Sequence, residues 1–184
     1  MYSDKQIINQ CKAWIEDLII GLNFCPFAKK EFVQNTIAYP IFRNVDIESA
    51  LESVINQCQT LDQNNDIETA LLIYPEQFRY FDDYLDFLSM AEQLIIEQGY
   101  EGVYQIASFH PDYYFADVDP SDVSNYTNRA PFPILHLIRE ASMERVIAVH
   151  PDVEGIPQRN MSLCEQKGEK YFIEYFKQLA HKDS

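Results

Sequence analysis

Two histidines and one cysteine are the residues of this chain whose types and positions best suit chemistry. His110 directly follows an apolar run typical of a strand, and His136 lies inside a later apolar run, ILHLI. Ligands gather at the carboxyl ends of strands in open α/β sheets, and an imidazole there can serve as acid, base or metal ligand. If His136 lies on a neighbouring strand, both rings converge with Cys25. We therefore expect a Cys–His nucleophile pair or, with all three side chains as ligands, a metal site.

A structural role is the alternative for each histidine. A histidine at a strand end more often satisfies its hydrogen bonds within the fold than binds a ligand. The spacing of His110 and His136 does not decide between a nucleophile pair, a metal site and a structural role, and it identifies no cofactor.

Cys25 lies in the segment NFCPFAKK. If Pro26 takes the first position of a short helix, Cys25 becomes its N-cap, where free backbone N–H groups and the positive end of the helix dipole stabilise a thiolate. Lys29 and Lys30 would add to that field. This arrangement predicts a nucleophilic thiol. The alternative is a small buried side chain at a tight turn, since free cysteines are common in protein cores.

A long segment without apolar periodicity, residues 109–133, separates two strand-like runs. Loops of this length in compact domains are usually functional or disordered, and its six aromatic residues favour order. It contains the string NRAPFP, in which Asn128 and the Arg129 guanidinium stand beside a proline-braced turn suited to holding a carboxylate or phosphate. With Arg139, and with Tyr113 from the same loop, they form the predicted substrate-binding set. Pairing of Arg129 with the loop's own aspartates is the alternative.

The elements that must position these side chains alternate along the chain. Apolar residues recur at helical spacing in some segments and in compact or alternating runs in others. These patterns predict helices at 4–22, 46–61 and 80–98 and strands at 36–42, 69–74 and 102–109. The succession βαβαβ favours an α/β fold with three or four strands in one layered sheet, an N-terminal helix and a long C-terminal helix. A ferredoxin-like α+β order is the alternative.

Residues 133–149 have two interpretations. They fit one helix, or a fourth strand, ILHLI, followed by a helix at 143–149 with Ser142 as its N-cap, and we favour strand then helix. Pro157 begins a final helix that we expect to continue to about Ala180.

Composition narrows the partners and the compartment. The formal net charge of −15 repels phosphate backbones and anionic lipids, which argues against nucleic-acid and membrane binding. No apolar run approaches the roughly 18 to 20 residues of a membrane span, and the N-terminus lacks the features of a signal peptide. The four cysteines show no zinc-site or disulfide spacing, so we expect free thiols in a reducing cytoplasm. With no linker or internal repeat, the 184 residues are predicted to form a single domain.

Four strings together resemble a bacterial protein family of about this length that is known only as a domain of unknown function. They are GLNFCPFA (21–28), FHPDYYF (109–115), NYTNRAPFPILHLIRE (125–140) and GIPQRN (155–160), and the resemblance is nearly full length. It implies no activity. The positions that match the family's motifs are Cys25, Pro26, His110, Pro111, Asn128, Arg129, Pro131, His136, Arg139 and Glu140.

The string CPFA alone also resembles the active-site motif of omega-class glutathione transferases, in which the cysteine reacts with glutathione. In that family a strand precedes the motif and a cis-proline faces it, whereas a predicted helix precedes Cys25.

These observations give one leading hypothesis and two alternatives. The leading hypothesis is a cytoplasmic enzyme for a small anionic metabolite, with His110 as acid or base, Cys25 as nucleophile or metal ligand, and Arg129 and Arg139 as an anion clamp. The first alternative is a non-catalytic module whose aromatic loop grips a metabolite or a partner protein. The second is a glutathione-linked thiol protein.

Overall fold

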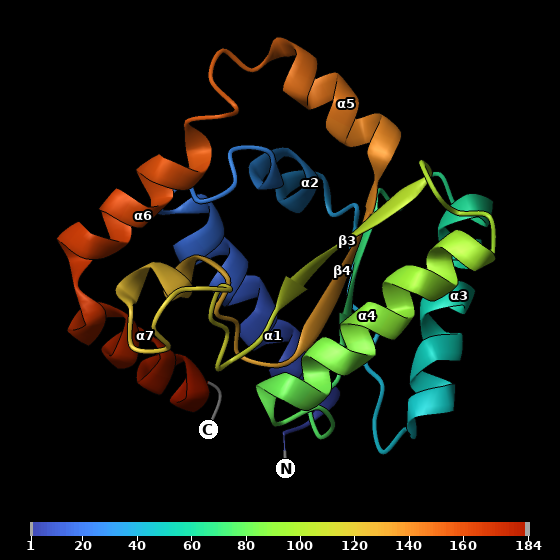
Figure 1. The fold of residues 1–184 in the computed structure, drawn as a ribbon, viewed down its shortest axis with the longest axis horizontal. Coiled ribbons are helices and arrows are strands. Elements are labelled where there is room, and N and C mark those ends of the chain that lie inside the picture. Colours follow the sequence, from blue (N-terminus) through green and yellow to red (C-terminus); the bar gives the residue numbers. More distant parts are fainter. Residues whose placement is uncertain (1, 183–184) are drawn as a thin grey trace.

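The computed structural model describes residues 2–182 and has an α/β fold in which helices cover both faces of a four-stranded sheet (Figure 1). The strands are β1 (Ile37–Ala38), β2 (Thr69–Ile73), β3 (Tyr104–Phe109) and β4 (Ile134–Arg139). Their order across the sheet is β1-β2-β4-β3. β1 and β2 are parallel, whereas β4 runs antiparallel to both β2 and β3. The last strand of the chain is therefore inserted between two strands that precede it.

The central position of β4 places His136 in the middle of the sheet. His136 lies opposite Leu71 of β2 on one side and opposite Ala107 of β3 on the other. Successive side chains of a strand point to opposite faces, so His136 points to one face of the sheet and its neighbour Leu137 to the other.

One face of the sheet is covered by α3 (Ile47–Gln63) and α4 (Phe81–Glu97), which share a buried apolar cluster with Leu135 and Leu137. Tyr84 of α4 forms hydrogen bonds with the backbones of two strands, β4 and β3. Its hydroxyl donates to the carbonyl oxygen of Ile134 at 2.7 Å and accepts from the backbone N–H of Phe109 at 3.1 Å.

The opposite face is covered by α1 (Asp4–Trp14), which continues directly into a π-helical segment, η1 (Ile15–Ile20). The predicted helix at 4–22 thus changes its winding after Trp14. Gly21 ends the segment, and a side chain does not fit there because an added Cβ would lie 2.3 Å from the carbonyl oxygen of Asp17. The chain then turns, and the backbone N–H of Cys25 donates to the carbonyl oxygen of Ile19 at 3.2 Å. Single π-helical turns often occur at functional sites.

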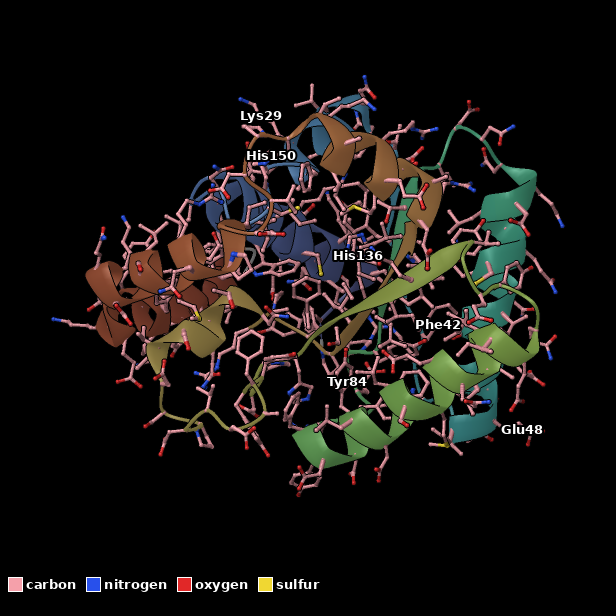
Figure 2. All side chains as sticks on the ribbon, turned by 45° about the horizontal axis from the view of Figure 1, so that its top comes forward. Lys29, Phe42, Glu48, Tyr84, His136 and His150 are labelled. Carbon is pink, nitrogen blue, oxygen red and sulfur yellow. The ribbon has the colours of Figure 1, made fainter. Side chains whose placement is uncertain are left out.

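Two short helices, α2 (Ala28–Gln34) and α5 (Glu140–Val149), complete this side of the molecule, and neither contains a fully buried residue. They meet where His150, directly after α5, packs edge-on against the ring of Phe27 at 5.4 Å between centroids; Figure 2 labels His150 next to Lys29 of α2. The prediction of strand then helix for residues 133–149 is confirmed, but α5 begins at Glu140, so Ser142 is not its N-cap.

The predicted long C-terminal helix is two helices, α6 (Ile156–Lys167) and α7 (Glu169–His181). Gly168 separates them with a φ of +75°, a conformation that favours glycine. The loop at 109–133 contains a 3₁₀ helix, η2 (Val123–Thr127), where Tyr126 stacks on Phe172 of α7 at 4.6 Å. On its other side Tyr113 packs against Phe81 of α4. The aromatic residues of the loop therefore anchor it to helices.

The predicted strand at 36–42 is shortened to β1 and a single bridge between Ile41 and Ile73. Pro40 lies between these two parts and has no N–H to donate to a ladder. All four cysteines are free, as predicted. Within residues 2–182, no helix combines the length and the apolar character needed to cross a membrane.

Candidate functional site

A cavity of about 220 Å³ lies between the sheet and the segments η1, α2 and α5. Its walls are mostly apolar and include Trp14, Leu71 and Phe109. His136 and Cys25 line the same cavity, so the structure brings these two predicted residues to one site. Figure 2 shows His136 in the interior, on the side of the β3 ribbon away from Tyr84.

The hydrogen bonds of Thr69 fix the proton arrangement of His136. The Thr69 hydroxyl donates to the carbonyl oxygen of Leu137 at 2.5 Å, and its oxygen lies 2.6 Å from Nε2 of His136. Because the single hydroxyl proton is already used, Nε2 must carry the proton and donate to Thr69. We assign Nδ1 as the unprotonated nitrogen; it has no partner within residues 2–182 and is not sealed from solvent. The ring therefore offers the cavity one free acceptor.

Burial also keeps this ring uncharged. Removal from water lowers the pKa of His136 to about 4, because the imidazolium form loses its hydration. Nδ1 is thus available as an acceptor at neutral pH.

Cys25 differs from the prediction in both geometry and charge. α2 begins at Ala28, so Cys25 belongs to a turn that precedes the helix and is not its N-cap. Burial raises the pKa of the Cys25 thiol, and backbone hydrogen bonds from Phe27 and Ala28 to the sulfur lower it by less. The net effect favours the thiol, and the expected stabilisation of a thiolate is outweighed by loss of water.

The polar rim of the cavity carries two carboxylates, Glu31 of α2 and Glu68 just before β2. Burial raises the pKa of Glu31, but hydrogen bonds from Thr36 and Lys30 lower it by more, so the net pKa is lowered and Glu31 is ionised at neutral pH. Glu68 accepts a hydrogen bond from Ser142 of α5. A rim of this kind repels anions.

With this geometry in place, the chain can be compared with known proteins. The family described as "Protein of unknown function (DUF1415)" matches residues 6–174. The chain belongs to the DUF1415 family. This confirms the resemblance to a family of unknown function. No curated protein and no solved structure matches the chain significantly.

In this DUF1415 chain His110 lies apart from the cavity and packs against Phe81 and Tyr84 of α4, at 5.2 and 5.1 Å between ring centroids. Its Nε2 donates to the carbonyl oxygen of Phe78 at 2.8 Å, and its Nδ1 accepts from the backbone N–H of Asp112 at 3.0 Å. Both ring nitrogens are therefore occupied. Phe109, one position earlier, points into the cavity, so strand alternation sends His110 to the other face. The expected convergence of His110 with Cys25 does not occur.

Arg129 and Asn128 of the DUF1415 chain also lie outside the cavity. Arg129 donates to the carbonyl oxygens of Tyr113 at 3.2 Å and Pro120 at 2.8 Å, which holds the loop together. The Asn128 amide donates to the carbonyl oxygen of Ser108 at 3.3 Å. Asn128 lines a neighbouring cavity of about 540 Å³, whose wall also includes Cys25.

Arg139 and Tyr113, the remaining predicted binding residues, have structural contacts. Arg139 points to the face of α3, where its guanidinium donates to the carbonyl oxygen of Leu61 at 2.5 Å and to the Tyr104 hydroxyl at 3.1 Å. Arg139 binds the last turn of α3, whereas Arg129 binds carbonyl oxygens of the loop, so the two do not form the expected clamp. Tyr113 packs against Phe81 of α4 and against Phe115 of its own loop.

The conditional metal site is not formed. Among residues 2–182, no three histidine, cysteine, aspartate or glutamate side chains are arranged to hold a metal ion. Cys25, His110 and His136 do not meet because His110 lies on the other side of the sheet.

Thr69 is the site residue that sequence reasoning missed. It begins a strand whose other residues are apolar and buried, TALLI. A hydroxyl at the buried end of such a strand needs a partner, and that requirement was the available signal.

Proposed function

We propose that this DUF1415 chain binds a small, largely apolar, uncharged molecule in the cavity beneath α2 and α5, and that Nδ1 of His136 accepts a hydrogen bond from it. The observation that carries the proposal is a neutral imidazole with one free acceptor in the wall of a mostly apolar cavity. An apolar pocket with few convergent polar groups is the usual form of a small-molecule site.

The size of the cavity supports a compact ligand. Its volume of about 220 Å³ is below the range of roughly 300–1,000 Å³ found for drug-sized ligands. A molecule with a single six-membered ring is therefore a reasonable upper limit.

The rim supports an uncharged ligand. Glu31 and Glu68 line this side of the cavity, and the cations near them are already paired with them: Lys30 lies 3.0 Å from Glu31 and Arg145 lies 4.0 Å from Glu68. An anion that enters past the two carboxylates would lose hydration without meeting an unpaired cation there. The anionic substrate expected from the sequence therefore fits this cavity poorly.

Two matched ring compounds test the proposal. Cyclohexanol carries a donor, whereas cyclohexanone has the same skeleton and only an acceptor. We expect cyclohexanol to bind about tenfold more tightly in titration calorimetry, which is about 1.4 kcal/mol and the size of one net hydrogen bond. The indole N–H resonance of Trp14, the single tryptophan and part of the cavity wall, should shift on binding.

Matched variants locate the binding. Ala107→Leu fills the cavity and should abolish binding, whereas Ala148→Leu, on the exposed side of α5, should leave it unchanged. His136→Phe should remove the preference for the alcohol. Equal binding of the ketone by the unmodified protein, or undiminished binding by Ala107→Leu, would contradict the proposal.

Catalysis in the same cavity is the second candidate, because Cys25 and a neutral imidazole line the same wall. A base with a pKa of about 4 accepts protons weakly at neutral pH, and a general base works best with a pKa near the operating pH. The raised pKa of Cys25 also slows thiolate chemistry, including exchange with glutathione. Binding therefore has the stronger support.

A further inference from the structure

Gln10 of α1 has a buried amide without a partner. Its side chain is only 3% exposed, and Nε2 makes no hydrogen bond within residues 2–182. An amide that leaves water without gaining a partner is costly, so such groups call for an explanation. Gln10 lines a second cavity, of about 460 Å³, between α1, α7 and the segment 111–132. Figure 1 shows α7 beside α1, with the loop between residues 110 and 130 in front of them.

Two cations line the same cavity. Lys177 of α7 is exposed at its edge, and Arg129 enters from the loop. Neither has a carboxylate within 4.0 Å among residues 2–182. Two unpaired cations beside an unpaired amide are unexpected in a chain with a net charge of −15.

The Arg129 guanidinium is held in position before any ligand arrives. Nε and one terminal nitrogen, Nη2, donate to the carbonyl oxygens of Tyr113 and Pro120, and the group lies over the Tyr126 ring at 4.4 Å. The other terminal nitrogen, Nη1, takes no part in these bonds. A fixed guanidinium edge loses little entropy when it binds an oxygen anion.

The rest of the wall restricts the anion. Asp112 also lines the cavity and would repel a phosphate, which carries about −1.5 to −2 charges at pH 7. A carboxylate has a single charge and two oxygens, which suits one ammonium, one guanidinium edge and one amide. The side chains of Phe132 and Phe176 give an apolar surface for the body of the ligand.

We infer that the cavity between α1, α7 and residues 111–132 is a binding site for a small organic monocarboxylate with an apolar body. Lys177 and Arg129 hold the carboxylate, and the Gln10 amide, whose Nε2 is sealed from solvent in the unliganded structure, turns toward the cavity to donate to it. The site is separate from the cavity of the proposed function, and it stands if that function fails.

The test uses hexanoate, benzoate and acetate as probes, with hexanol as the uncharged match and inorganic phosphate as the dianion. Binding is measured by titration calorimetry, and the side-chain amide resonances of Gln10 report the position. We expect hexanoate to bind at least about tenfold more tightly than hexanol and phosphate, and to shift the Gln10 amide.

Four variants test the roles of the individual residues. Gln10→Leu should weaken hexanoate binding about tenfold or more, and it should leave the unliganded protein at least as stable as before, because it removes a costly unpaired amide. Lys177→Gln should weaken binding several-fold. Lys170→Gln lies on the same helix outside the cavity and should have no effect. His136→Phe should also leave hexanoate binding unchanged, which separates this site from the first.

Four outcomes would overturn the inference. They are no binding of any carboxylate at about 20 mM, equal binding of hexanol, tighter binding of phosphate, and an equal loss in Lys170→Gln and Lys177→Gln, which would indicate attraction to net charge alone.

Discussion

The protonation of His136 gives a quantitative prediction about stability in acid. In the unfolded chain an imidazole has a pKa of about 6.5, whereas burial lowers the pKa of His136 to about 4. As the pH falls, the unfolded chain therefore takes up its proton first. The stability associated with the neutral ring is fully present above about pH 6.5 and is lost between about pH 6.5 and 4.

The size of this loss follows from the two pKa values. At about 1.36 kcal/mol per pKa unit, the full difference between about 6.5 and about 4 corresponds to about 3 kcal/mol. Between about pH 7.5 and about pH 4.5 the accessible part is about 2.5 kcal/mol.

The assay compares the free energy of unfolding in urea at these two pH values for the unmodified protein and for His136→Gln. Glutamine keeps a donor for the Thr69 hydroxyl and does not titrate. Carboxylates and His110 titrate in both proteins, so their contributions cancel in the difference. We expect the unmodified protein to lose about 2.5 kcal/mol more than the variant.

If the unmodified protein and His136→Gln lose the same free energy of unfolding between the two pH values, within about 0.5 kcal/mol, the reasoning is refuted. Equal losses would mean that the protonated ring finds water or an anionic partner inside the fold. Nδ1 of His136 could then not be described as a neutral acceptor below about pH 6.5.

Two further predictions concern Tyr84 and Cys25. Tyr84→Phe should lower the free energy of unfolding by about 2 kcal/mol, because it removes the hydroxyl that pairs with the carbonyl oxygen of Ile134 and the N–H of Phe109. Tyr80→Phe, at an exposed position, should not change the free energy of unfolding. Equal effects of the two substitutions in urea denaturation would contradict this prediction. Iodoacetamide should add a single label to the folded protein, at Cys25, because the other three cysteines are buried, and the labelling rate should rise with pH around a midpoint above about 8.5. Measurement of the intact mass checks that one label is added, and the Cys25→Ser variant should take up none. A midpoint below the pKa of a free thiol would instead support Cys25 as a nucleophile.

The helices and strands could be predicted because their apolar spacing is local. Asp46, for example, accepts from the backbone N–H of Ser49 at 2.8 Å and begins α3 as expected. The change to π-helical winding before Gly21 was not predictable from the apolar spacing, which continues through the segment. Gly168 could have indicated the break between α6 and α7, but the apolar spacing continues on both sides of it and favoured one long helix.

The order of the strands could not be predicted, because no local pattern distinguishes a β4 at the edge from a β4 between β2 and β3. Part of the site could have been predicted from strand alternation. In a strand, residues separated by an odd number of positions point to opposite faces. His136 and Arg139 differ by three positions and Phe109 and His110 by one, so a consistent count would have separated Arg139 from His136 and His110 from Phe109. Of the three residues expected to converge, Cys25 and His136 line the same cavity.

The inserted strand has a consequence for biosynthesis. A ribosome delivers β1, β2 and β3 before β4, yet β2 and β3 form no hydrogen bonds with each other and each is paired with β4. A nascent chain of about 110 residues therefore exposes two open strand edges, which are templates for aggregation, until the final third of the polypeptide emerges. Closure of the sheet has to wait for β4, and any transcript truncated before Ile134 encodes a polypeptide that cannot complete it.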